Sequence, residues 1–400
     1  MNLKSGLPFW LIKSGLPFDY PKLNEHLDTD VLILGGGISG GLAGYHLTNA
    51  GVKCTIVDSR EIGMGSTCAS TSLLQYELDI PLCKLNDIIG LDDAVRTYQL
   101  CAKAIGKLKI IANEIGLDDF ENKKSLFFAD NKKHVQLIKD EYRIRKENNF
   151  NVEFLENAEI KKEYNFSSPA AILSDTAAET NAYKFTHLLH QSIIKKGNDV
   201  FERTTVEKIE HSDKGIAVTT TDGKIIKAKK TIYATGYEAV NQVGKKIAKL
   251  YSTYAVASKK LDDVSWWNKD ILYWNSADPY LYMRTVNNDR IIIGGRDEPF
   301  YYPAKRDKLL EKKSDDLVKD FNKLFPKKIF KPQFAWTGTF AEAKDSLPFI
   351  GSYNKKPNGY FTLGFGGNGI IFSLIAAEIL TDLIKGRSNP NTHLFSFDRL

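Results

Sequence analysis

The chain has 400 residues, 42% of them hydrophobic, and its 55 Lys and Arg against 49 Asp and Glu leave a modest formal net charge of +6. This composition fits a globular enzyme with a large core, and the length allows two domains. The four cysteines lie 14, 15 and 18 residues apart without a CxxC or Cys/His pattern, and no apolar run is long enough to span a membrane. We therefore expect a cytoplasmic protein without a metal site, a disulfide framework, a transmembrane segment or a signal peptide.

The start of the chain contains a direct repeat, because the hexapeptide KSGLPF occurs at Lys4–Phe9 and again at Lys13–Phe18. Two short copies are too few for a solenoid. Residues 1–27 are expected to form an arm that lies over the folded body, with the aromatic side chains of Phe9, Trp10 and Phe18 in surface grooves. A partner-binding role for this arm is the alternative.

Residues 30–58 have the pattern of a strand, a glycine-rich turn, an amphipathic helix and a second strand that ends on Asp58. Gly35, Gly37 and Gly40 stand at G-x-G-x-x-G spacing, which permits a tight turn, a close approach of a pyrophosphate and tight helix–strand packing. The helix N-terminus would present N–H groups to the phosphates. Asp58 lies where a carboxylate accepts hydrogen bonds from a ribose 2′-OH and disfavours NADP. A glycine-rich turn without a ligand is the alternative.

Helical and strand patterns alternate through the middle of the chain. After a loop of small residues at 63–72, apolar spacing predicts helices over roughly 86–150 and over Lys184–Lys195. A strand near Val200 precedes two alternating runs, which Asp222-Gly223 would join as a hairpin turn. Another buried strand is expected within 231–237.

Two stretches of unusual composition follow. Residues 251–282 hold eight Tyr or Trp; most of these are expected to pack in a sheet, and one or two to line an apolar substrate pocket. Residues 305–331 are rich in lysine but also in acids, and their apolar positions follow a helical period. A solvated helix face is therefore expected there, rather than a surface for nucleic acid.

A second glycine-rich loop lies near the C-terminus. A strand at Tyr360–Leu363 runs into Gly364-Phe-Gly-Gly-Asn-Gly369, and an apolar helix opens at Ile370. Such a loop can place backbone N–H groups against an anionic or carbonyl oxygen. Two loops of this kind, far apart in the chain, indicate a large cofactor that is held from two sides.

Taken together, these motifs resemble the D-amino acid oxidase-like flavoenzymes, the group of glycine oxidase, sarcosine oxidase and gamma-glutamylputrescine oxidase. The resemblance covers nearly the whole chain, and its pieces are specific as an ordered set. They are the turn at Gly35–Gly40, Ser59-Arg60 with the loop GSTCAST, Val206 in a strand pair, Tyr233-Ala-Thr-Gly236, Tyr282-Met-Arg284, Gly294-Gly-Arg-Asp-Glu298, Leu347-Pro-Phe-Ile-Gly351 and Gly364-Phe-Gly-Gly-Asn-Gly369.

The resemblance implies an α/β fold with a Rossmann-type FAD-binding domain assembled from residues 28–85, 178–240 and 335–400. An α+β substrate domain on a mostly antiparallel sheet would be inserted, from residues 86–177 and 241–334. The resemblance also implies FAD as the cofactor. Its expected binding residues are Gly35, Gly37, Ile38, Ser39, Gly40, Asp58, Ser59, Arg60, Gly65, Ser66, Thr67, Val206, Ala234, Thr235, Gly236, Gly366, Gly367, Asn368, Gly369 and Ile370.

Some relatives attach flavin covalently, through a cysteine in the C-terminal half or a histidine in the loop near 66–70. Here the last cysteine is Cys101, and that loop has Cys68-Ala69 without a histidine. The resemblance therefore implies non-covalent FAD, and Cys68 is expected to fill space near the ring. Because FAD carries the difficult chemistry, no acid–base triad is expected.

The implied activity is transfer of a hydride to flavin N5 from the carbon next to nitrogen in a small amine or amino acid. The resulting imine hydrolyses, and oxygen or another electron acceptor takes up the electrons. Two alternatives stay open: an oxidoreductase of the same fold that acts on a 2-hydroxy acid, and a flavin-binding protein without turnover.

Amino-acid oxidases of this group carry a carboxylate-binding arginine just before the LPFIG-like segment, whereas Trp336–Asp345 contains none. Either the substrate lacks an α-carboxylate or another cation binds it, since an unpaired buried charge is disfavoured. Arg284 is expected to be that cation, and an ion pair at the domain interface is its alternative role. Arg296 is the second candidate for this cation, and its alternative role is a structural ion pair with its neighbours Asp297 and Glu298. Tyr282 and Trp336 complete the expected substrate-binding set.

Overall fold

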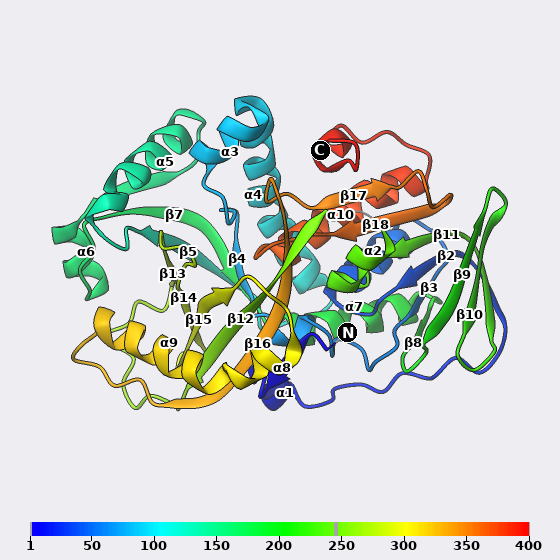
Figure 1. Cartoon of the computed structure of the whole chain (residues 1–400), viewed down its shortest axis with the longest axis horizontal. Coiled ribbons are helices and arrows are strands. Elements are labelled where there is room, and N and C mark those ends of the chain that lie inside the picture. The colour runs from blue at the N-terminus through cyan, green and yellow to red at the C-terminus, as the bar shows by residue number, and fades with distance from the viewer. Residues whose placement is uncertain (1, 244–246, 400) are drawn as a thin grey trace.

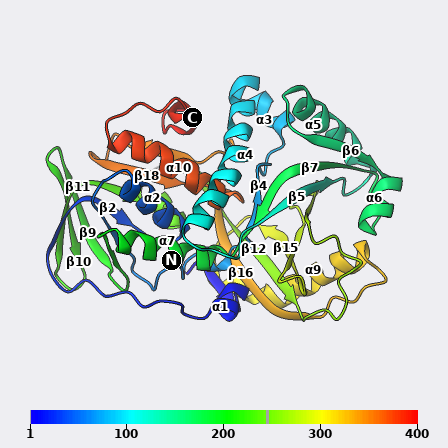
Figure 2. The same cartoon turned by 180° about the vertical axis from the view of Figure 1, so that it is seen from behind.

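The structure is a computed structural model that describes residues 2–243 and 247–399, and it consists of two lobes side by side (Figure 1). The described residues leave out residue 1 of the predicted arm, residues 244–246 of the predicted substrate domain and residue 400 of the predicted FAD-binding domain. Each lobe is built on one β-sheet, and helices pack on both sheets (Figure 2). This arrangement confirms the predicted α/β class.

The first lobe has an eight-stranded sheet that contains the predicted dinucleotide turn. Its strands are β2 (Leu27–Leu34), β3 (Cys54–Val57), β8 (Asp199–Phe201), β9 (Val206–Ser212), β10 (Gly215–Thr220), β11 (Ile225–Tyr233), β17 (Phe349–Ser352) and β18 (Gly359–Leu363). The order is β17-β18-β11-β2-β3-β8, in which β18, β11, β2, β3 and β8 are parallel. Gly223, with a φ of +74°, makes the predicted turn between β10 and β11.

Three helices of this lobe are almost wholly buried, because they pack on the sheet and on one another. They are α2 (Ile38–Asn49), α7 (Ala182–Lys195) and α10 (Gly369–Ile384). The helix α2 packs against both α7 and α10. The predicted helices after the first turn, over 184–195 and from 370 onward are thereby confirmed.

The second lobe has a ten-stranded, mostly antiparallel sheet in the order β1-β16-β12-β15-β14-β13-β5-β7-β4, with β6 beside β7. Within it, β5 and β13 are a parallel pair. The strands are β1 (Lys4–Gly6), β4 (Leu73–Gln75), β5 (Glu121–Phe128), β6 (Val152–Glu156), β7 (Ala170–Glu179), β12 (Ala248–Ser258), β13 (Ile271–Asn275), β14 (Tyr282–Val286), β15 (Arg290–Glu298) and β16 (Pro332–Ala343).

Helices of very different length surround this sheet. They are α1 (Phe9–Ser14), α3 (Leu82–Ile89), α4 (Leu91–Glu114), α5 (Val135–Glu147), α6 (Asn157–Tyr164), α8 (Pro303–Lys308) and α9 (Leu310–Leu324), and α11 (Thr392–Phe395) lies near the C-terminus. Short 3-10 turns cover Thr67–Ala69, Lys132–His134 and Gly236–Gln242. The long helix α4 runs between the lobes and contacts α10 on one side and β7 on the other (Figure 2).

The structure differs from the predicted pattern in two places. The prediction of helix over 86–150 is wrong for β5, which is a strand because both its edges pair, with β7 and with β13; tertiary pairing overrides local propensity. The predicted segment boundary at 334/335 falls inside β16, and β4 before residue 85 also belongs to the ten-stranded sheet. The lysine-rich stretch forms α8 and α9, as its period indicates.

The N-terminal arm belongs to the second sheet, because β1 pairs with the edge strand β16. Phe9 and Trp10 on α1 are 4% and 1% exposed, whereas Phe18 is 39% exposed, so its predicted place in a groove is wrong. The Trp10 indole N–H donates to the carbonyl of Ser70 at 2.6 Å.

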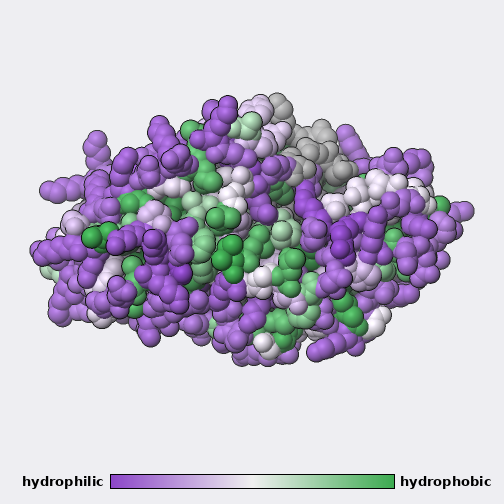
Figure 3. Space-filling model, turned by 90° about the horizontal axis from the view of Figure 1, so that it is seen from below, coloured by the Kyte–Doolittle hydropathy of each residue, from purple (hydrophilic) through white to green (hydrophobic). Residues whose placement is uncertain are grey.

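Apolar side chains gather near the middle of the molecular face seen from below (Figure 3).

The two copies of KSGLPF provide a matched pair of variants. Phe9→Ala should destabilise the protein by about 3–5 kcal/mol, because it removes a buried ring that packs on Trp10 and Phe334. Phe18→Ala should cost less than about 1 kcal/mol. Denaturant unfolding of both variants measures the difference, and equal losses would contradict the packing of the arm.

Candidate cofactor and substrate site

A cavity of about 570 Å³ lies at the carboxyl ends of the parallel strands, where the first sheet faces the second. In open α/β sheets this edge is the usual ligand position, because loops from neighbouring strands meet there. The turn after β2, the loops after β3 and β11, and the loop before α10 line one part of the cavity. Side chains from β12, β14, β15 and β16 line the other part.

The glycine turn after β2 has the geometry that its spacing predicts. Gly35 has a φ of +109°, which favours glycine, and a Cβ on Gly40 would lie 1.9 Å from the Gly35 carbonyl oxygen. Gly40 therefore permits the helix to start this close to the strand, and it does not itself line the cavity. The Thr67 hydroxyl accepts the Ile38 N–H at 3.0 Å, which ties the second loop to the start of α2. Sequence analysis missed this contact.

Asp58 is fixed at the cavity wall by the backbone. Its two carboxylate oxygens accept the N–H groups of Gly36 at 2.7 Å and of Arg60 at 2.9 Å. Burial raises the pKa of Asp58, and these hydrogen bonds oppose that shift. The neighbouring Arg60 pairs with Glu238 at 2.7 Å.

All of the expected cofactor residues except Gly40 line this one cavity, although they come from four separate parts of the chain. The Ser66 hydroxyl is buried there without a hydrogen-bond partner among the described residues. A bound group with polar oxygens would satisfy it. In the C-terminal loop the Asn368 amide donates to the carbonyls of Gln75 and Glu77, both at 2.9 Å.

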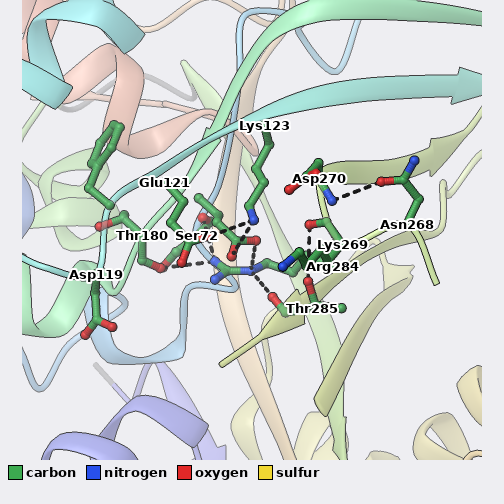
Figure 4. A network of polar contacts seen from close by, with 12 residues as sticks. Ser72, Asp119, Glu121, Lys123, Thr180, Asn268, Lys269, Asp270, Arg284 and Thr285 are labelled. Atoms are coloured by element: carbon green, nitrogen blue, oxygen red, sulfur yellow. Dashed lines mark hydrogen bonds and ion pairs between the residues drawn. The ribbon is translucent and has the colours of Figure 1, made fainter. Parts of the chain in front are cut away.

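Of the expected substrate-binding residues, Tyr282 lines the cavity, but Arg284 does not. Arg284 is 3% exposed, and its guanidinium donates to the carbonyls of Thr71, Ser72 and Thr180 at 2.9–3.1 Å (Figure 4). It also lies 3.1 Å from the Glu179 carboxylate. The three carbonyls lie at Nη1 and the carboxylate at Nε, away from the cavity, so the structure supports the alternative role of Arg284, an ion pair between segments.

Arg296 and Trp336 also point away from the cavity, contrary to the prediction. Arg296 makes a two-contact ion pair with Asp320 of α9. Trp336 is buried against the arm, and its indole N–H donates to the Ala69 carbonyl at 2.8 Å. Cys68 is buried outside the cavity lining. Burial raises the pKa of its thiol to about 11, as expected of a space-filling residue.

Sequence analysis missed two carboxylates at the end of the cavity formed by the second sheet. Asp79 accepts the Gly367 N–H at 2.7 Å and the Tyr280 hydroxyl at 2.9 Å. Asp297 of β15 lines the same end, together with Thr253, Tyr282 and Phe340. Burial raises the pKa of Asp297 to about 7; Asp79 adds to the shift, and Thr253 and Lys313 oppose it.

Comparison with known proteins places this site in a family. The profile described as "FAD dependent oxidoreductase" (DAO) matches residues 30–383. This chain belongs to that family. The match confirms the resemblance to D-amino acid oxidase-like enzymes and makes the protein an FAD-dependent oxidoreductase.

Several known proteins are similar to this chain at low sequence identity. A Bacillus subtilis protein with the provisional name of a Rieske 2Fe-2S iron–sulfur protein is 23% identical over 98% of this chain and 75% of its own. Gamma-glutamylputrescine oxidoreductase of Escherichia coli K12 is 24% identical over 92% and 86%. The glycine oxidase structure from Geobacillus kaustophilus has 18% identity and a TM-score of 0.78, over 94% and 99%.

The cavity of this family member fits FAD. The glycine turn is bare at Gly37, where an added Cβ would lie only 2.9 Å from the Thr67 hydroxyl, and Ser66, with its unpartnered hydroxyl, lines the same cavity. Among the described residues there is no group of three or more side chains that could hold a metal ion. No helix in the described part of the chain is both long and apolar enough to cross a bilayer.

Gly37→Val should abolish FAD binding, because the added side chain would displace the Thr67 hydroxyl, 2.9 Å from its Cβ, and enter the space left for the pyrophosphate, while the overall helix and strand content is kept. Gly106→Ala is the matched control, since a Cβ there meets nothing within 4 Å. Flavin absorbance per protein and circular dichroism of both variants provide the test. Full flavin occupancy in Gly37→Val would show that the turn does not bind the cofactor.

Proposed function

We propose that this chain holds FAD non-covalently and oxidises a carbon–nitrogen bond of a small amine or amino acid. The observation that carries the proposal is the cavity itself, which runs from the glycine turn of the first sheet to a wall of polar and aromatic side chains on the second. The names of two relatives, gamma-glutamylputrescine oxidoreductase and glycine oxidase, agree with such a substrate. Bound FAD would supply the chemistry, taking a hydride from the carbon next to nitrogen, and the imine product hydrolyses in water.

The residues of the chain then have to bind, orient and exclude solvent. Gly35, Gly37 and the start of α2 would hold the pyrophosphate, and Asp58 the adenosine ribose. Residues 366–370 would approach the isoalloxazine from the N-terminus of α10, where N–H groups favour a carbonyl or anionic oxygen. Tyr282 and Phe340, on β14 and β16, would form the substrate wall.

The charges of this wall favour an amine over the alternatives. The cationic side chains among the described lining residues are Arg60 and Lys356, and both lie at the dinucleotide end, Arg60 beside Glu238 and Lys356 beside His211. A 2-hydroxy acid, or an amino acid bound through its α-carboxylate, would place an anion near Asp79 and Asp297 without a compensating cation. Like charges in a low dielectric repel strongly. Because Arg284 is occupied elsewhere, the substrate is best explained as an amine without an α-carboxylate.

Anaerobic mixing with a panel of primary and secondary amines, amino acids and 2-hydroxy acids tests this function. We expect an amine to bleach the flavin absorbance near 450 nm, whereas 2-hydroxy acids do not. Reduction by hydroxy acids alone would support the dehydrogenation of alcohols instead. If no compound in any class reduced the flavin, the chain would be a flavin-binding protein without turnover. Admission of oxygen afterwards shows whether oxygen is the acceptor.

The flavin should be released when the protein is precipitated with acid. The Cys68 thiol donates to the Gly65 carbonyl and has a raised pKa, so it is a poor nucleophile. Yellow supernatant over a colourless pellet is the expected result, and colour retained in the pellet would reveal a covalent bond. The cytoplasmic location stays a prediction.

A further inference from the structure

We propose that the substrate carries a second cationic group, besides the amine that is oxidised, and that Asp297 binds this group with the help of Asp79. The ligand class is therefore a diamine or a related dication. This inference rests on the proposed function, because it concerns the substrate end of the same cavity.

The first support is the position of the Asp297 carboxylate. Asp297 lines the cavity from β15, and its side chain is partly exposed there. Its Oδ1 atom is buried without a hydrogen-bond partner among the described residues, and the side chain of Thr253 is the hydrogen-bond partner of the carboxyl group. A buried polar atom without a partner is rare and calls for an explanation. The part of the Asp297 side chain that stays exposed to the cavity can accept a donor from the substrate, which would offset the cost of the unpartnered oxygen.

The second support is the balance of charge at this end of the cavity. Asp79 accepts from two neutral donors, the Gly367 N–H and the Tyr280 hydroxyl, and makes no salt bridge with any residue that the structure describes. Lys313 of α9 is a cation that acts on Asp297, but its ammonium binds the Glu298 carboxylate at 2.5 Å and the Arg296 carbonyl at 3.0 Å. Two half-buried carboxylates in one wall, without a paired cation among the described residues, disfavour each other's ionisation. A cationic group on the substrate would relieve this cost.

The third support is the aromatic character of the same wall. Trp274, Tyr280 and Tyr282 line the cavity, and the ring centroids are 6.1 Å apart for Trp274 and Tyr280 and 5.8 Å apart for Tyr280 and Tyr282. Aromatic faces attract ammonium groups and also pack against methylene carbons. An alkyl chain with an ammonium at its far end matches this combination better than a carboxylate or a neutral group does.

The experiment compares four ligands of equal carbon chain with the FAD-loaded wild-type protein under anaerobic conditions. They are 1,4-diaminobutane, 1-aminobutane, N-acetyl-1,4-diaminobutane and 4-aminobutanoate. Stopped-flow reduction should give a rate constant divided by Kd that is at least roughly tenfold higher for the diamine than for the other three. This comparison needs no variant. If 1-aminobutane gave the same rate constant divided by Kd as the diamine, the inference would be overturned and the proposed function would stay intact.

Asp297→Asn then assigns the effect to one side chain. It should retain FAD and reduce the diamine preference, measured as the ratio to 1-aminobutane in the same variant, to roughly threefold or less; Asp297→Glu, which keeps the charge, should restore part of the preference. Asp262→Asn, the same change at an exposed acid of this lobe, is the control. An unchanged preference in Asp297→Asn would overturn the inference. Absence of flavin reduction by any amine would overturn the proposed function and the inference with it.

Discussion

The buried guanidinium of Arg284 is the contact on which the walls of the cavity depend. It lies on β14 of the second sheet. It donates to the carbonyls of Thr71 and Ser72, just before β4, and of Thr180, just after β7. The ring of Trp10 from the arm covers it at 5.4 Å. Because arginine presents its donors in a rigid planar fork, this one group fixes the relative positions of three separate segments. Removing one partner of such a buried pair costs about 3–5 kcal/mol, since the other charge is left uncompensated.

The cofactor end of the cavity could be predicted from sequence because its determinants are local. The turn at Gly35–Gly40 and the loop before Ile370 each depend on glycines within a few residues, at positions where a strand ends and a helix begins. Nineteen of the twenty expected cofactor residues line the cavity, and the exception, Gly40, supports the turn from behind. The general course of the fold followed in the same way from apolar periodicity, except where β5 is held by its two neighbours.

The substrate end could not be predicted because its determinants are distant in sequence. Arg296 and Asp297 are adjacent, and successive residues of a strand point to opposite faces. Which of them faces the cavity depends on the irregular register between β12 and β15 at Ser252 and Tyr254, and on the φ of +60° at Arg296. The sequence shows neither feature. Tyr282 lines the cavity as predicted. Its ring fits there because Gly294 has no side chain: a Cβ at Gly294 would lie 2.3 Å from the tyrosine.

The carboxylates of that wall carry the last step of the argument. A buried acid without a cation destabilises the fold, and a polar or apolar side chain of similar size would avoid the cost. Proteins keep such residues mainly where function uses them, since stabilising substitutions are otherwise easily found. The buried acids elsewhere in this chain are compensated: Glu77 and Glu141 pair with Arg145, and Glu179 pairs with Arg284. Asp79 and Asp297 line the cavity without a salt bridge to any described residue, whereas Glu77, which also lines it, is paired with Arg145. The missing charge is therefore best sought in what the cavity binds.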